Sequence, residues 1–310
     1  MITSRPYPPI YFDPTSDFGF KKLFGEEGSK KRLIDFLNTL LPSHHQIKSL
    51  TFLKSDQLPR HEEDRKAIFD ILCENQDGEK FIIEMQKAAL THMMDRSVYY
   101  GTFPIQQQAI KGPWNFKLSP VYLIGILDFP YDTDEKRWGK RKLLRTFTLR
   151  DEDGILMTEN LAFKIIQLPF FTKTAEELTT HFDKWCYFLK NLESFDVLPN
   201  ILNEPIFMEA AEVAKISNLS PADLLLYEMS ERSKYDMQLV KEEADRSGME
   251  RGMEKSAIKT VLIAYLKGFS AQQISDFTEI WLEKITTIIA LYDDSLDLEG
   301  NIHAILDKTM

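Results

Sequence analysis

The stretch FDILCENQDGEKFIIEMQ (69–86) decides the fold of this chain. Two segments rich in apolar and β-branched residues, 65–75 and 79–87, lie on either side of a short polar sequence at 76–78. Strand-like segments that flank an Asp-Gly turn sequence predict a β-hairpin. The sequence therefore places an antiparallel pair of strands at the centre of the fold.

Two carboxylates and one amide stand out in this hairpin because the residues around them are apolar. Side chains alternate along a strand, so Glu84 and Gln86 are expected to share one face and Met85 to point to the other. Asp70 interrupts the first, otherwise apolar, segment. Burying two carboxylates together is unfavourable unless a cation pairs with them, and oxygen ligands of this kind suit Mg²⁺. The pattern indicates a divalent-metal site.

The length of the turn decides whether the two carboxylates meet. A two-residue Asp-Gly turn would pair Asp70 with Met85 and put Glu84 on the wrong face. A three-residue loop at 76–78, with Gly78 at positive φ, would pair Asp70 directly with Glu84. A metal site requires the second register. In the alternative, the two acids are unrelated residues at the edge of the sheet.

The segments around the hairpin predict an α/β fold. Helical patterns cover 15–25, 28–42 and about 90–110, and strand patterns cover 47–56, 121–129, 143–150 and 160–168. The order as far as residue 129 is helix, strand, strand, strand, helix, strand. We expect a mixed sheet flanked by helices within residues 1–200.

The chain beyond these strands is expected to be helical. Helical patterns cover 174–193, 206–217 and a long segment that begins at residue 220. The charged segment 241–255 contains two glycines, so it is either a solvated helix or a hinged linker. We treat 201–255 as a helical extension or linker.

Residues 256–310 are expected to form a separate small helical unit with the spacing of a helix-turn-helix. The helix that would read DNA contains Glu279, Glu283 and a single Lys284. This acidic composition is unsuited to approaching phosphate. A packing or oligomerisation module is therefore favoured over a DNA reader.

Charge is distributed unevenly along the chain, whose formal net charge is −10. Residues 201–310 contain 11 Lys+Arg and 20 Asp+Glu, whereas residues 1–200 contain 27 and 28. Within the first part, KRWGKRKLLRTFTLR (136–150) has seven basic residues and no acid. Lys140, Arg141 and Lys142 are candidate contacts to DNA phosphates, the alternative being a solvated strand and loop.

A cytoplasmic location is expected, with no membrane partner. No apolar run is long enough for a membrane helix, and the N-terminus has no basic region followed by an apolar segment. Cys73 and Cys186 lie in apolar segments, where free thiols behave as small hydrophobes. Nothing in this pattern indicates a disulfide framework.

The segment DPTSDFGFKKLFG (13–25), followed by 69–86, resembles the recombination-promoting nuclease and transposase family. That family is a branch of the PD-(D/E)XK nuclease superfamily. The resemblance covers most of the chain and is weakest at the C-terminal end. It implies the superfamily core order αβββαβ, which is the order read above.

The resemblance implies an active site in the hairpin. Asp70 and Glu84 would be the catalytic metal ligands, with Mg²⁺ as the cofactor and Mn²⁺ as its substitute. Gln86 stands where most of the superfamily has lysine, and glutamine is characteristic of this branch. An amide cannot accept a proton at neutral pH, so Gln86 could only orient the attacking water.

Four further residues are implied as support for this site. Asp17 and Lys21 belong to the opening motif. Ser16 or Asp17 could cap the helix over 15–25. For Asp17 the choice is between approaching the metal and capping the helix, with the cap favoured. Lys21 would contact phosphate or lie on a solvated face. Arg96 and Tyr100 lie on the helix after the hairpin, where they would either clamp a phosphate or support the sheet.

The expected function is Mg²⁺-dependent DNA endonuclease activity that hydrolyses backbone phosphodiesters, linked by the resemblance to recombination or mobile-element transposition. The alternative is a catalytically weak or inactive DNA-binding or scaffold protein with the same fold, favoured by Gln86 and the acidic C-terminal third. A nuclease directed at RNA or single strands is a third hypothesis. A homodimer is expected, because two sites cut both strands of a duplex most simply.

Overall fold

The computed structural model describes residues 9–57, 67–89, 92–109, 115–131, 135–278 and 280–309. Two compact units divide the chain, Met1–Ser230 and Glu231–Met310. Within these ranges, the first unit contains the strands, and the second is helical. The domain boundaries predicted near residues 200 and 255 stay predictions.

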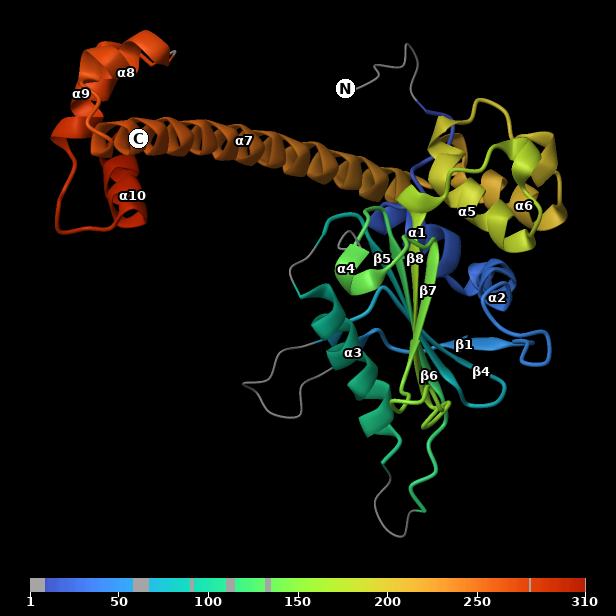
Figure 1. Cartoon of the computed structure of the whole chain (residues 1–310). Coiled ribbons are helices and arrows are strands. Elements are labelled where there is room, and N and C mark those ends of the chain that lie inside the picture. The colour runs from blue at the N-terminus through green and yellow to red at the C-terminus, as the bar shows by residue number, and fades with distance from the viewer. Residues whose placement is uncertain are drawn as a thin grey trace. The chain divides into compact units, whose positions relative to one another are not determined.

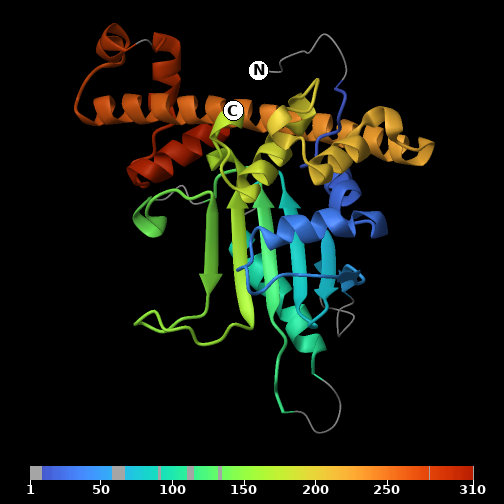
Figure 2. The same cartoon turned by 90° about the vertical axis from the view of Figure 1, so that its right-hand side faces the viewer.

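The first unit is built on a mixed six-stranded sheet with the order β1-β4-β5-β6-β8-β7 (Figures 1 and 2). Its strands are β1 Leu50–Phe52, β4 Ile71–Asn75, β5 Lys80–Gln86, β6 Val121–Leu127, β7 Leu144–Thr148 and β8 Leu161–Gln167. The central strands β5, β6 and β8 are parallel, and the other pairs are antiparallel. A second, two-stranded sheet pairs β2 Asp56–Gln57 with β3 Ala67–Ile68.

Helices cover both faces of the large sheet (Figure 1). One face carries α3, Met93–Gln107, which packs through Tyr100 against Leu72, Ile82 and Leu123. Four helices share the main apolar core of the other face: α1 Asp17–Phe24, α2 Lys30–Asn38, α5 His181–Asn191 and α6 Pro205–Ala214. The short α4, Glu135–Trp138, precedes β7. Single 3-10 turns occur at Glu27–Ser29, Leu168–Phe170, Ala175–Glu177, Leu192–Ser194, Asn200–Leu202 and Ile216–Asn218. This is the expected α/β architecture with a helical C-terminal region.

The β4–β5 hairpin adopts the three-residue register. Ile71 pairs with Ile83 and Leu72 with Ile82, so the next pair towards the open end is Asp70 with Glu84. The turn closes through the hydrogen bond from Asn75 N to Glu79 O at 3.0 Å. Gly78 has φ of 79°, a conformation that glycine adopts without steric penalty. The register that the metal site requires is confirmed, and it places Asp70 opposite Glu84.

Two predicted strands are shorter than their sequence patterns. The pattern over 47–56 becomes β1 and β2, which belong to different sheets. The pattern over 65–75 becomes β3 and β4, and residues 65 and 66 lie outside the described part. A bend at Asp70, whose Oδ2 accepts from Met85 N on the neighbouring strand, separates β3 from β4. Residues 90 and 91 of the predicted helix 90–110 are also not described.

The second unit consists of the C-terminal part of α7, Pro221–Leu266, together with α8 Ala271–Phe277, α9 Leu282–Ala290 and α10 Leu298–Thr309. Its core is formed by Ile258, Leu262, Ile274, Ile285 and Ile302. Helix α7 continues through Gly248 and Gly252, so segment 241–255 is helical rather than an irregular linker. Among the described helices, none has both the length and the apolar character needed to span a bilayer.

Candidate active site

Asp70 and Glu84 meet at the edge of the sheet where the parallel strands have their carboxyl ends. Asp70 N donates to Glu84 Oε1 at 3.2 Å, and Met85 N donates to Asp70 Oδ2 at 2.8 Å. Across the hairpin, the Glu84 side chain therefore bonds the backbone of Asp70, and the Asp70 side chain bonds the backbone of Met85, next to Glu84. Glu84 is 6% exposed and Asp70 is half-buried.

Burial makes both carboxylates reluctant to ionise. Desolvation and the neighbouring charge of Asp70 raise the pKa of Glu84 from 4.5 to about 8. Desolvation also raises the pKa of Asp70, opposed by its hydrogen bond from Met85 and by the charge of Lys21. Two carboxylates that share one buried site cannot both ionise easily without a cation.

Gln86 and Arg96 surround Glu84 on the same face of the sheet. Gln86 Nε2 donates to Glu84 Oε2 at 3.2 Å. Arg96 Nη2 lies 3.9 Å from Glu84 Oε2, at the limit of an ion pair, and the Arg96 guanidinium is 4.7 Å from the centre of the Tyr100 ring. Tyr100 itself is buried in the contact between α3 and the sheet. Tyr100 thus supports both the sheet and the guanidinium above it.

A glycine on the neighbouring strand leaves room beside Glu84. Gly125 is paired with Glu84 in the β5–β6 register. A Cβ atom at Gly125 would lie 3.0 Å from Ile165 Cδ1, so a larger residue would crowd this layer. A cavity of about 20 Å³ is lined there by Glu84, Gln86 and Arg96, among others. This is the space of roughly one water molecule.

The opening motif contributes charges near Asp70, but its capping residue is Ser16. Ser16 Oγ accepts from Gly19 N at 3.0 Å and caps α1, so the expectation that Asp17 is the cap is wrong. Asp17 is the first helical residue, its side chain is 71% exposed, and it pairs with Lys21 at 2.7 Å. Their opposite charges shift the pKa of Asp70 in opposite directions.

A second carboxylate of the opening motif, Asp13, was not singled out from the sequence. It is buried and pairs with Lys87, the residue after Gln86. Thr15 N and Oγ1 donate to Asp13 Oδ1 at 2.9 and 2.6 Å. The Lys87 side chain is therefore bound to the opening motif. It does not take the place of the lysine that most of the superfamily has at the position of Gln86. The Asp-Pro-Thr sequence signals a local turn, but not its partner 74 residues away.

Lys140, Arg141 and Lys142 lie in the exposed connection between α4 and β7. Leu144, at the start of β7, pairs with Ile166 near the end of the antiparallel β8. The connection is therefore at the same edge of the sheet as Glu84 and Gln86, beside α4 in Figure 1. The expected DNA-contact residues and the carboxylate pair share one side of the first unit.

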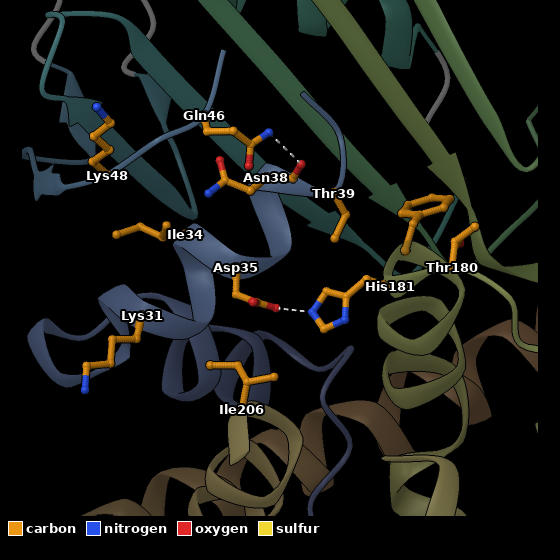
Figure 3. A pocket seen from close by; sticks show the side chains of 11 residues that line it. Lys31, Ile34, Asp35, Asn38, Thr39, Gln46, Lys48, Thr180, His181 and Ile206 are labelled. Atoms are coloured by element: carbon orange, nitrogen blue, oxygen red, sulfur yellow. Dashed lines mark hydrogen bonds and ion pairs between the residues drawn. The ribbon is translucent and has the colours of Figure 1, made fainter. Parts of the chain in front are cut away.

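A larger groove, of about 710 Å³, lies between α2 and α5 on the opposite face of the sheet (Figure 3). Its centre is Asp35, whose Oδ2 bonds His181 Nε2 at 2.6 Å and accepts from Trp185 Nε1 at 2.7 Å. The bond to Asp35 raises the pKa of His181. Asn38 lines the groove, and its side-chain amide donates to Ile47 O and accepts from Ile47 N. These polar groups hold helices and a loop together, and none belongs to the carboxylate site.

A mixed sheet with helices on both faces and paired carboxylates at the ends of its central strands defines a nuclease-like α/β class of protein. The chain belongs to the PD-(D/E)XK nuclease family transposases, whose family model matches residues 14–244. No curated protein and no solved structure gives a significant match. Membership supports a nuclease or transposition-related role.

Proposed function

We propose that this chain is a Mg²⁺-dependent DNA endonuclease whose active site consists of Asp70, Glu84 and Gln86. The observation that carries the proposal is the meeting of the buried Glu84 and the half-buried Asp70 at the open end of the hairpin, where each carboxylate accepts from the backbone of the other strand. A pair of buried acids without a cation is unfavourable, whereas a site for Mg²⁺ explains it. The family membership supports nuclease chemistry and a role in transposition or recombination.

The donor set suits a hard divalent cation held by Asp70 and Glu84. Within the described residues, no group of three or more His, Cys, Asp or Glu side chains is arranged to hold a metal ion. Mg²⁺ is commonly bound through one or two carboxylates, with substrate phosphate and water as further ligands. When bound, the cation would neutralise both carboxylates and make a water molecule more acidic.

The other residues of the site orient its polar groups and offset the negative charge of the two carboxylates. Gln86 is an amide, so it cannot remove a proton and instead orients Glu84 or a nearby water by hydrogen bonding. Arg96 is exposed and carries a guanidinium, a group that binds phosphate oxygens in pairs. Lys21 lies at the same edge and opposes the negative charge of Asp70. Arg96 and Lys21 would thus supply positive charge beside the carboxylate pair for a substrate phosphate.

A second candidate function is a weak or inactive nuclease fold that binds DNA as a scaffold. Gln86 favours this candidate, because most members of the superfamily use a lysine at that position. Metal binding separates the two functions, since a scaffold without a metal site gains no stability from Mg²⁺.

Incubation of labelled duplex DNA, single-stranded DNA and RNA with the protein and Mg²⁺ tests the proposed substrate. The proposal expects internal cleavage of duplex DNA. Cleavage of RNA or single strands alone would contradict duplex specificity, and no cleavage of any substrate by folded protein would favour the scaffold. We also propose a homodimer, which light scattering in solution can detect.

Neutralising Lys140, Arg141 and Lys142 together to glutamine is expected to weaken duplex binding and flatten its salt dependence. Each lost phosphate contact removes roughly 0.9 from the slope of log K against log salt concentration. Fluorescence anisotropy at several salt concentrations measures this slope. The same change at Lys215, Lys255 and Lys259, which lie outside the sheet, is the charge-matched control. An unchanged slope in the first variant would return residues 140–142 to the solvated-loop interpretation.

A further inference from the structure

Gln167 is a buried polar residue whose side chain holds two separate backbone segments. It ends β8 and is 0% exposed. Its Oε1 accepts from Tyr131 N at 2.8 Å, and its Nε2 donates to Lys142 O at 2.9 Å. Its own N–H donates to Leu143 O at 2.8 Å. One residue therefore fixes the backbone on both sides of residues 136–142, which we name the basic segment.

Aromatic packing supports the middle of the basic segment. The ring of Trp138 meets Tyr131 edge-on at 5.1 Å and Phe147 at 6.0 Å. The Arg137 guanidinium lies 4.7 Å from the centre of the Trp138 ring. The backbone thus has ties at residues 131 and 142 and a packed side chain between them. The basic side chains of such a segment are held in a defined position, which a loose loop would not provide.

The β-sheet register places Gln167 beside the candidate active site. Gln86 pairs with Leu127 in β5–β6, and Leu127 pairs with Gln167 in β6–β8. The three residues form one row across parallel strands, with their side chains on the face covered by α3. Two strand spacings separate Gln86 from Gln167, which is about 10 Å. Measured along the axis of a DNA duplex, this corresponds to the rise of roughly three nucleotides.

We propose that Gln167 is a positioning residue that aligns the basic segment with the carboxylate pair, so that Lys140 and Lys142 bind phosphates a few nucleotides from the one that is cleaved. The inference rests on the proposed DNA endonuclease function. It adds the residue that fixes the distance between the basic segment and the carboxylate pair. Both lysines are exposed.

The chemistry of glutamine fits this task better than that of other residues of its size. A neutral amide offers one acceptor, for Tyr131 N, and one donor, for Lys142 O, at the same time. A carboxylate offers acceptors only, and an apolar side chain satisfies neither group. Because unpaired buried polar groups are unfavourable, a variant without the amide releases the basic segment to pair with water.

The test measures duplex DNA binding in metal-free buffer, where no cleavage occurs. Gln167→Met keeps the volume and removes both hydrogen bonds, and it is expected to weaken binding roughly three- to tenfold and to flatten the salt slope. Gln167→Asn, which is too short to reach both partners, gives the same direction of change if the Met variant does not fold. Asn38→Leu is the matched control, because Asn38 likewise ties a loop through both its donor and its acceptor. It should leave binding unchanged.

Combining Gln167→Met with the neutralised residues 140–142 separates positioning from general damage. If Gln167 acts through the basic segment, the change has no further effect once the charges are gone. The inference is overturned if Gln167→Met lowers DNA affinity equally in both backgrounds, or if it does not lower affinity in the wild-type background. Either result leaves the proposed DNA surface in place. If the variant with only residues 140–142 neutralised binds DNA as tightly as the wild type, both the proposed DNA surface and the inference are overturned.

Discussion

Replacing Glu84 by glutamine is expected to reduce DNA cleavage by about two to three orders of magnitude and to stabilise the metal-free protein. The variant keeps the size of the side chain but removes a ligand charge, and charge stabilisation by a bound metal contributes several kcal/mol. At the same time it removes the cost of keeping Glu84 protonated in the folded state, a cost that opposes folding above pH 4.5 in the absence of a cation. Cleavage assays and thermal melts measure the two effects.

Glu79→Gln is the matched control for this variant. Glu79 is also a buried carboxylate, just before the other end of β5, where it bonds Asn75 Nδ2 at 2.6 Å and His45 Nε2 at 2.7 Å. Losing that charge should reduce stability and leave cleavage unchanged. Cleavage by Glu84→Gln within a few-fold of the wild type would show that Glu84 is not a ligand.

The second large effect is a dependence of metal-free stability on pH. The folded-state pKa of Glu84 is about 8, against 4.5 for the free side chain. Between these values the folded protein keeps a proton that the unfolded chain has lost, so stability falls as pH rises through this window. Each pKa unit corresponds to about 1.4 kcal/mol, which sets an upper limit of about 5 kcal/mol for the effect. The melting temperature of wild type relative to Glu84→Gln should decrease from pH 5 to pH 8 and then level off.

Mg²⁺ is expected to reverse this loss, because its ligands bind in the ionised form. Metal at a hundredfold excess over its Kd stabilises by about 2.7 kcal/mol, which is of the order of 5 °C for a domain of this size. The thermal shift should therefore be larger at pH 8 than at pH 5.5 and absent in Glu84→Gln. A shift of the same size in the variant would place the metal elsewhere.

The hairpin could be predicted because it depends on local sequence, whereas its register was open between a two-residue and a three-residue turn until the strand pairing was known. The turn at 76–78, the alternation of β5 and the apolar surroundings of Asp70 lie within 18 residues. These features decide which residues face each other. The shared face of Glu84 and Gln86 followed from the same periodicity.

The contacts that could not be predicted join residues far apart in the chain. Asp13 and Lys87 meet across 74 positions, and Gln167 reaches Tyr131 across 36. Such pairs depend on how helices and loops pack on the sheet, which no local pattern specifies. A buried glutamine at the end of an apolar strand looks like an ordinary strand end until its two partners are known.

Helix α7 shows a different limit of local reasoning. Gly248 and Gly252 each disfavour a helix by roughly 1 kcal/mol, which made a hinge as plausible as a helix. The surrounding methionine, glutamate and arginine residues are good helix formers, and the helix continues. Glu279, one of the acids counted against DNA reading in the C-terminal unit, lies outside the described residues.

The central claim is that Asp70 and a divalent cation act together at the hairpin, and plasmid cleavage by wild type and Asp70→Asn, each with and without Mg²⁺, tests it most directly. The account predicts nicked or linear DNA only for wild type with Mg²⁺, while both proteins remain folded by circular dichroism. Cleavage by Asp70→Asn at the wild-type rate, or equal cleavage by wild type without any divalent metal, would contradict it.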